Sequence, residues 1–399
     1  MSLFRTRGTA DGERVENVEL FFDLVFVFAV TRLSHTLLED LTTAGALRVA
    51  LLIFAVWWVW IYTSWVTNWL APERPPVRIC LFVMMIAGLL LAVSIPHAFD
   101  RHALLFAASY VFMQVGRTAF FLWAARESSL AMRRNFQRIL IWMCASAVFW
   151  LCGALIAHAQ PLLWALAMGL ELLGPFAFYW VPGLGRSTTL SWNISGAHLA
   201  ERCGLFIIIG LGESLLVTGT TFAELPWTAR SLTALGSAVI GSILMWWIYF
   251  DTGAGRAHHR IVHSDDPGRQ GRLAYTYLHV LIVAGIIVCA VADELVLAGI
   301  GSAMEGHQAA GHRGGVAWIT ILAGPLLYVI GTALFKWATN DRRTPPLSHL
   351  IGIALLLALT WPARTHMLSS LGMSIATTGV LLIVALWESR ALKAEREHP

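Results

Sequence analysis

Long, uninterrupted apolar segments restrict the fold of this chain more than any other feature of its sequence. An α-helix needs about 20 residues to cross a bilayer. A window of that length predicts twelve spans, near residues 18–38, 46–70, 77–95, 103–124, 137–158, 161–181, 199–220, 231–250, 273–292, 316–337, 348–361 and 368–387. The segments lack the alternating pattern of a membrane β-barrel strand. We therefore predict an all-α polytopic membrane protein with about twelve transmembrane helices.

The charge content agrees with this class. Only 28 basic and 24 acidic residues occur among 399, or 13%, whereas a soluble domain has roughly 25% charged residues. So few charges exclude soluble enzymes, nucleic-acid-binding proteins, secreted disulfide scaffolds and disordered chains. The five cysteines lie in apolar segments without a Cys-x-x-Cys spacing, so neither disulfides nor a thiolate metal site are predicted.

The distribution of Lys and Arg predicts an orientation. With the N-terminus in the cytoplasm, 20 of the 28 basic residues fall on the cytoplasmic side, five on the other side and three within spans. Cytoplasmic loops are enriched in Lys and Arg, so we expect both termini to be cytoplasmic. Residues 1–17 lack the short apolar region of a cleavable signal, and we expect the first apolar segment to remain as a span.

The two halves of the chain share four short matches in the same order. They are Glu16 with Leu20-Phe21 and Glu201 with Leu205-Phe206, Trp60-Ile61-Tyr62 and Trp247-Ile248-Tyr249, Ala87-Gly88 and Ala284-Gly285, and Thr118-Ala119 and Thr332-Ala333. We interpret them as a parallel six-plus-six repeat. Its halves are residues 18–181 and 199–387, joined by a cytoplasmic linker, 182–198, and flanked by cytoplasmic tails, 1–17 and 388–399. The first span would then face the seventh.

The first and seventh predicted spans also carry the most ionisable residues. An ionised side chain at the bilayer centre costs about 2.5–3.5 kcal/mol on insertion scales, so such residues usually pair, face the protein interior or line a polar path. Helical periodicity places Glu16, Glu19 and Asp23 on one face. Like charges repel at this spacing, so we expect one of Glu19 and Asp23 to hold a proton. An ion pair from Arg202 to Glu19 or Glu16 would join the two spans.

We predict a buried polar network from these and other intramembrane residues. The candidates are Glu16, Glu19, Asp23, Arg32, His35, Arg117, Glu171, His198, Glu201, Arg202 and Glu213. Those near span ends could instead begin helices, where carboxylates are stabilised, or extend to the headgroups. A network that only fixes helix packing is the main alternative to a functional one.

No motif indicates catalysis or a cofactor. His259 and His263 have the spacing of a metal pair, but they lie in a polar loop with other charged residues. Gly212-Glu213-Ser214 lacks the second glycine of a nucleophile elbow. We expect a protein that is not an enzyme and that uses no cofactor, metal or nucleic acid. Its expected partners are membrane lipids and an unidentified small solute or ion.

Two charged segments carry a resemblance. Glu19-Leu-Phe-Phe-Asp23-Leu-Val-Phe-Val-Phe-Ala29, followed by Ser34-His35, resembles the opening signature of the bacterial low temperature requirement protein A family, and the segments 198–206 and 210–214 resemble its second signature. The resemblance implies a multi-pass bacterial inner-membrane protein. The family is named for a growth phenotype, so the resemblance implies no molecular activity.

Taken together, the residues favour a secondary transporter or an ion- or proton-translocating protein, with a buried carboxylate and arginine network between the halves. The alternative is a non-transporting membrane protein that supports growth in cold or envelope stress by binding lipid or a partner. A membrane enzyme acting on a lipid or isoprenoid is the least supported, because it would need a nucleophile or a metal in a cavity open to the lipid.

Overall fold

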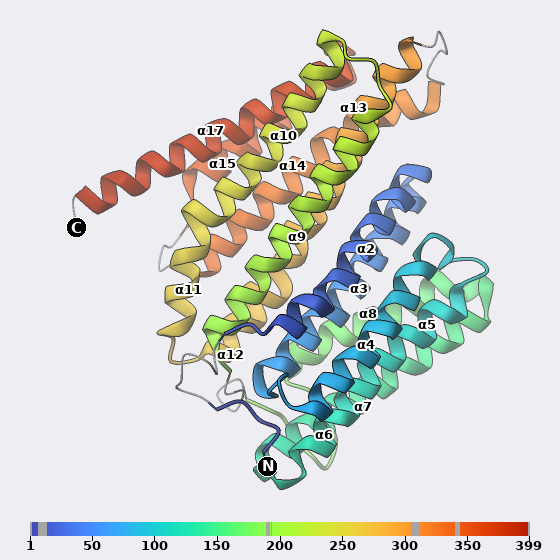
Figure 1. Ribbon diagram of the computed structural model, residues 1–399, viewed down its shortest axis with the longest axis vertical. Helices are drawn as coiled ribbons and strands as arrows, with labels where there is room; N and C mark the ends of the chain where they lie inside the picture. Colours follow the sequence, from blue (N-terminus) through green and yellow to red (C-terminus); the bar gives the residue numbers. More distant parts are fainter. Residues whose placement is uncertain are drawn as a thin grey trace. The chain divides into compact units, whose positions relative to one another are not determined.

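The computed structural model of the chain describes residues 2–6, 14–188, 192, 194–304, 311–339 and 344–397. Within these ranges the regular structure is helical, apart from two isolated bridges, Phe4 to Leu70 and Val181 to Gly185. The predicted all-α class is therefore confirmed for the described residues (Figure 1).

The longer helices follow the predicted spans closely. They are α2 (Asn17–Glu39), α3 (Thr43–Trp69), α4 (Pro75–Ser94), α5 (Ala103–Val111), α6 (Arg117–Ala124), α7 (Leu130–Leu155), α8 (Gln160–Phe176), α9 (Gly196–Ala223), α10 (Ala229–Tyr249), α13 (His279–Met304), α14 (Gly311–Thr339), α15 (Leu347–Ala358) and α17 (Ser370–Glu397). Shorter helices are α11 (Gly255–Val262), α12 (Pro267–Gln270) and α16 (Thr360–Arg364). Three π-helical segments, Phe112–Gly116, Phe250–Ala254 and Gly271–Leu278, interrupt the longer runs.

Eleven helical stretches in the described part of the chain are long and apolar enough to cross a membrane. They correspond to every predicted span except residues 161–181. That segment forms α8, which has 17 residues and ends at Phe176, five residues earlier than predicted. The chain turns there because Pro175 is followed by Phe178 and Tyr179 in the left-handed conformation, with φ of 52° and 48°.

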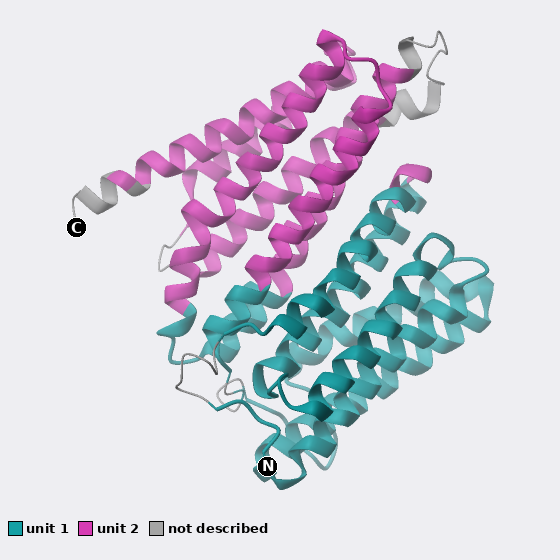
Figure 2. Ribbon diagram, in the orientation of Figure 1, with its two compact units in different colours: residues 1–36, 43–202, 261–276 teal, residues 37–42, 203–260, 277–399 magenta. Residues whose placement is uncertain are grey.

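The chain divides into two compact units (Figure 2). Unit 1 contains residues 1–36, 43–202 and 261–276, and unit 2 contains residues 37–42, 203–260 and 277–399. Unit 1 thus includes most of α2, all of α3 to α8 and the first turns of α9. Unit 2 includes α10, α13, α14, α15 and α17.

Helix α3 is the central element of unit 1. Every residue from Ala55 to Ser64 is buried, and a helix that is apolar and buried on all sides lies inside a protein rather than at its surface. The tryptophans Trp57, Trp58 and Trp60 are at most 1% exposed. Polar groups along α3 therefore face other protein side chains, and this places them where a site can form.

Close backbone approach holds α13 and α14 together in unit 2. A Cβ atom added at Gly285 would lie 2.6 Å from the backbone nitrogen of Tyr328, and one at Gly324 would lie 2.7 Å from that of Cys289. Small residues allow membrane helices to pack this tightly, and in lipid such packing replaces the hydrophobic effect as a driving force.

Gly285→Ala is expected to destabilise unit 2 by about 1–3 kcal/mol, the usual effect of overpacking a tight interior. The matched control is Gly299→Ala on the same helix, where a Cβ would meet nothing within 4 Å. Alanine has the higher helix propensity, so this control is expected to leave stability unchanged or slightly raised. Denaturant unfolding in detergent measures both, and equal midpoints would contradict the close contact.

Candidate functional site

A buried network of ionisable side chains joins the start of α2 to the first turns of α9 within unit 1. Its centre is Glu19, whose carboxylate accepts from Arg5 Nη2 at 2.6 Å and lies 3.0 Å from His198 Nε2 and 3.1 Å from Arg202 Nη1. The backbone N–H of Glu16 also donates to it, at 2.9 Å. Glu19, His198 and Arg202 are completely buried, so the carboxylate is held entirely by protein groups.

Asp23 lies one turn further along α2 and completes the network. Its Oδ1 accepts from Arg202 Nη2 and from Trp60 Nε1, both at 2.7 Å. The Arg202 guanidinium also lies over the Trp60 ring, 5.6 Å from its centroid. Oδ2 of Asp23 is buried and has no hydrogen-bond partner among the described residues. One oxygen of this carboxylate therefore keeps its lone pairs free.

The contacts with Asn68 and Glu19 favour one tautomer of His198, although Arg5 Nη2, which can only donate, also lies 3.2 Å from Nε2. Asn68 Nδ2 lies 3.3 Å from Nδ1 of the imidazole, and because an amide N–H can only donate, Nδ1 acts as the acceptor. Nε2 then carries the hydrogen that points to Glu19. Two hydrogen bonds to the Ser195 backbone fix the Asn68 amide. Asn68 Nδ2 donates to Ser195 O, and Ser195 N donates to Asn68 Oδ1, both at 2.8 Å. With this neutral imidazole, two carboxylates balance two guanidiniums.

The geometry bears on two of the sequence expectations. The expected ion pair between Arg202 and Glu19 is present, whereas Glu16 contributes only its backbone N–H. The expected repulsion between Glu19 and Asp23 is offset, because the Arg202 guanidinium binds both carboxylates.

Arg117 and Glu171 belong to a second buried cluster of unit 1. Glu171 accepts from Tyr110, Gln114 and Ser146 at 2.6–2.7 Å and from Trp150 at 3.1 Å. Arg117 donates to Val59 O at 3.1 Å, to Thr63 Oγ1 at 3.0 Å and to Gln114 Oε1. Gln114 thus links the two charges without direct contact between them.

Four of the predicted residues lie outside both clusters. Glu201 is exposed although it neighbours Arg202, since adjacent helix positions point about 100° apart. Arg32 is half-buried, with its guanidinium 4.7 Å from the Phe28 centroid, and His35 is also half-buried. Glu213 is buried in unit 2.

Sequence reasoning missed Arg5. It was counted with the polar N-terminal tail, but the tail folds back on α3, with Arg5 N donating to Trp69 O at 2.9 Å and Arg5 Nε to Thr67 O at 2.7 Å. Nothing in a short polar segment predicts that the N-terminal tail packs against α3.

A buried ion pair of unit 2 was missed as well. Lys336 Nζ lies 2.6 Å from Glu388 Oε2 and 2.8 Å from Thr252 Oγ1, and His349 Nδ1 lies 3.7 Å from the same carboxylate. Lys336 was counted among the basic residues of the cytoplasmic side, and Glu388 falls in the predicted cytoplasmic tail, 388–399. The available signal was that each directly adjoins a long apolar segment, and α17 in fact continues past Glu388 to Glu397.

Unit 2 also contains a small cavity, with a volume of about 30 Å³. The carboxylate of Asp293 lines it, together with the hydroxyl-bearing residues Ser237, Ser242, Ser374, Thr377 and Thr378. Such a volume holds water, which needs roughly 10–15 Å³. Among the described residues no group of three or more His, Cys, Asp or Glu side chains gathers as a metal site would require.

These features define a polytopic helical membrane protein whose helices enclose ionisable side chains. The model of a family described as bacterial low temperature requirement A protein matches residues 14–386. The chain belongs to this family, which confirms the resemblance found in its first and seventh predicted spans. It is 40% identical over 377 residues to an uncharacterized protein of Rhizobium meliloti (strain 1021), a match that covers 94% of this chain and 89% of the relative. No solved structure matches it.

Proposed function

We propose that this protein is a secondary transporter or an ion- or proton-translocating protein of the bacterial inner membrane. The observation that carries the proposal is the buried chain of His198, Glu19, Arg202 and Asp23, which ends in the unpartnered Oδ2 of Asp23. Intramembrane acids, bases and their relays are the usual parts of proton-coupled carriers.

Protonation of Asp23 gives this network a second state. A proton on Oδ2 removes one negative charge and leaves Arg202 paired with Glu19 alone, so the formal charge of the buried network rises by one. A buried charge without a counter-charge is unfavourable, and the protein is then driven toward an arrangement that rehydrates or re-pairs the guanidinium. A proton thereby changes the balance between two conformations, as coupling requires.

Asp293 supports the same proposal from within unit 2. Among the described residues, the Asp293 carboxylate forms no ion pair and no hydrogen bond. It lines a cavity together with five hydroxyl-bearing residues. Carboxylate and hydroxyl oxygens suit a proton, a water molecule or a hard cation.

The proposed membrane layout follows from the charge distribution and from α8. We place both termini in the cytoplasm, take α8 as a twelfth span at the short end of the usual 17–25 residues, and retain the six-plus-six parallel repeat. On this proposal the partners are membrane lipids and a small solute or ion, and the protein is not an enzyme.

A non-transporting protein that acts by binding lipid or a partner in cold or envelope stress is the second candidate. The observation that favours it is the pairing of Glu19, Asp23, Arg5 and Arg202 with opposite charges, because a paired network can serve helix packing alone.

Measuring the flux of protons or solutes across liposome membranes distinguishes the transporting protein from the non-transporting one. Purified protein in liposomes loaded with a pH-sensitive dye should move protons, alone or with an added cation or solute, faster than protein-free liposomes. Absence of flux across a screen of protons, Na⁺, K⁺ and small organic solutes would favour the non-transporting alternative.

A further inference from the structure

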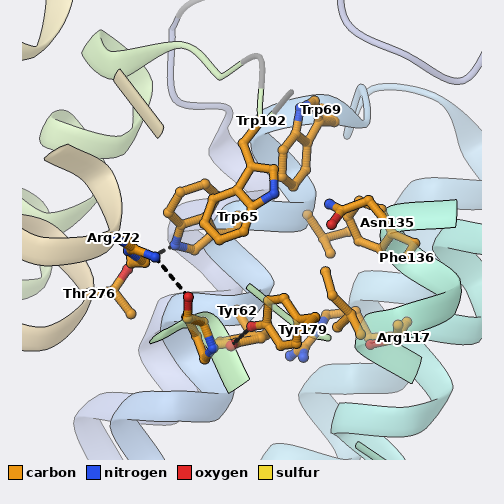
Figure 3. Close-up of a pocket in the computed structure, with 14 residues that line it drawn as sticks. Tyr62, Trp65, Trp69, Arg117, Asn135, Phe136, Tyr179, Trp192, Arg272 and Thr276 are labelled. Atoms are coloured by element: carbon orange, nitrogen blue, oxygen red, sulfur yellow. Dashed lines mark hydrogen bonds between the residues drawn. The ribbon is translucent and has the colours of Figure 1, made fainter. Parts of the chain in front are cut away.

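Unit 1 contains an aromatic cavity apart from the ion network (Figure 3). Its volume is about 40 Å³, slightly more than that of the cavity in unit 2. Six of its lining residues are aromatic: Tyr62, Trp65, Trp69, Phe136, Tyr179 and Trp192. The walls are therefore largely rings, and they fit an apolar, flat ligand body.

The charged groups in this cavity are all positive. Arg117 and Arg272 line it, and no Asp or Glu is among the lining residues. Figure 3 shows Arg272 and Thr276 on one side and Arg117 with Tyr62 and Tyr179 on the other. Arg272 donates to Pro175 O at 2.7 Å and lies 4.9 Å from the Phe178 centroid. Among the described residues neither guanidinium forms an ion pair with a carboxylate.

The carbonyl oxygen of the Asn135 side chain has no hydrogen-bond partner at this cavity in the described part of the chain. The side chain is only 6% exposed, it lines the cavity, and its Oδ1 has no partner among the described residues. The amide end lies on the cavity side in Figure 3. Buried amides are normally hydrogen-bonded, so an unsatisfied one at a cavity wall points to a ligand.

The backbone around the cavity is unusual in two ways. The π-helical segment Phe112–Gly116 directly precedes Arg117, and the segment Gly271–Leu278 contains Arg272 and Thr276. Single π-helical turns often occur at functional sites. In the turn after α8, the left-handed residues Phe178 and Tyr179 place one ring against Arg272 and the other in the cavity wall.

The polar end of the cavity also offers hydroxyl donors. The hydroxyls of Tyr62 and Tyr179 are hydrogen-bonded to each other. Burial raises the pKa of the Tyr179 phenol, so this hydroxyl stays protonated at neutral pH and can donate.

We propose that this cavity binds a small organic anion with an aromatic or similarly flat apolar body, such as an aromatic monocarboxylate. The rings would contact the body, while Arg272 and Arg117 would donate to the carboxylate. Aromatic walls can also attract organic cations, but the two guanidiniums, neither of which contacts a carboxylate directly among the described residues, repel them. An inorganic anion would leave the rings in contact with water. The proposal concerns binding and holds whether or not the protein transports.

Tryptophan fluorescence tests the proposal directly, because Trp65, Trp69 and Trp192 line the cavity. The purified full-length protein in detergent is titrated with benzoate, and with benzyl alcohol and benzylamine as neutral and cationic analogues. We expect a saturable change with benzoate and none with the analogues over the same range. An equal response to benzylamine, or no saturable response to benzoate, would overturn the proposal.

Arg272→Gln is expected to weaken benzoate binding about tenfold or more, the effect of losing one charge-assisted hydrogen bond. Arg272 is half-buried and forms no ion pair, so this variant should fold. Arg134→Gln is the control, because Arg134 is exposed and adjoins Asn135 on α7. Equal weakening in the two variants, or unchanged binding in Arg272→Gln, would contradict the assignment.

A second variant tests the shape of the cavity without changing its charge. A Cβ at Gly174 would lie 2.8 Å from the Tyr179 ring, whereas one at Gly169 on the same helix would meet nothing within 4 Å. Gly174→Ala should weaken benzoate binding and Gly169→Ala should not; the same affinity in both would overturn the assignment.

The same chemistry could come from an anionic lipid headgroup, and nanodiscs distinguish this source. Benzoate should bind equally in nanodiscs of phosphatidylcholine and in nanodiscs containing phosphatidylglycerol. Binding seen only without phosphatidylglycerol would assign the cavity to lipid and overturn the small-anion proposal.

Discussion

Arg202→Met is expected to lower the free energy of unfolding by about 3–5 kcal/mol, the usual effect of removing one partner of a buried ion pair. Arg202 binds both Glu19 and Asp23, at 3.1 and 2.7 Å. Its loss leaves two buried carboxylates to share Arg5, His198 and the Trp60 indole. Denaturant unfolding in mild detergent, followed by circular dichroism, measures the change.

Glu201→Gln is the matched control. Glu201 directly precedes Arg202 but is exposed, and surface substitutions usually change stability by less than about 0.5 kcal/mol. If Arg202→Met and Glu201→Gln proved equally stable, the buried network would not form as described.

Lys336→Met is expected to have an effect of similar size in unit 2. Lys336 is 1% exposed and Glu388 5% exposed, and their charges lie 2.6 Å apart. Removing the ammonium alone leaves a buried carboxylate whose remaining neighbours are the Thr252 hydroxyl and His349. Breaking such a pair from one side costs about 3–5 kcal/mol.

The double variant Lys336→Met with Glu388→Gln should be more stable than Lys336→Met alone, because no unpaired charge remains. Residues in direct contact show interaction energies of about 0.5–3 kcal/mol in double-mutant cycles. A cycle in which the two single effects simply add would show that the pair is not formed.

The class of the protein and the centre of the ion network could be predicted from the sequence. Long apolar segments have few alternatives in lipid, so the spans followed from hydropathy. Glu19, Asp23 and Arg202 interrupt such segments. Because placing an unpaired charge in lipid costs free energy, we could predict that these side chains pair. Helical spacing then placed Glu19 and Asp23 on one face, where Arg202 binds both.

Other parts depended on contacts between residues far apart in the sequence. Arg5 reaches Glu19 only because the N-terminal tail packs against the end of α3. The aromatic cavity combines residues of α3, α6, α7, the turn after α8 and the segment from Gly271, and no local pattern brings these together.

The ends of helices were the other source of error. A charged residue at the end of an apolar segment can lie either in solvent or inside the helix bundle, and the sequence pattern is the same in both cases. Lys336 was predicted on the cytoplasmic side and Glu388 in the C-terminal tail, and the structure buries both. Similarly, α8 ends at Phe176 rather than at residue 181 because the turn at Phe178 and Tyr179 redirects the chain.

Proton flux in liposomes containing Asp23→Asn, compared with wild type and Glu201→Gln, is the most direct test of the proposed translocation. Asparagine can still accept from Arg202 and Trp60 but cannot take up a proton, and Arg202 keeps its pair with Glu19. We therefore expect the flux to fall by about 100-fold or more, the scale of losing one proton-transfer group. Proton flux at the wild-type rate in Asp23→Asn would contradict the proposed role of Asp23 in translocation.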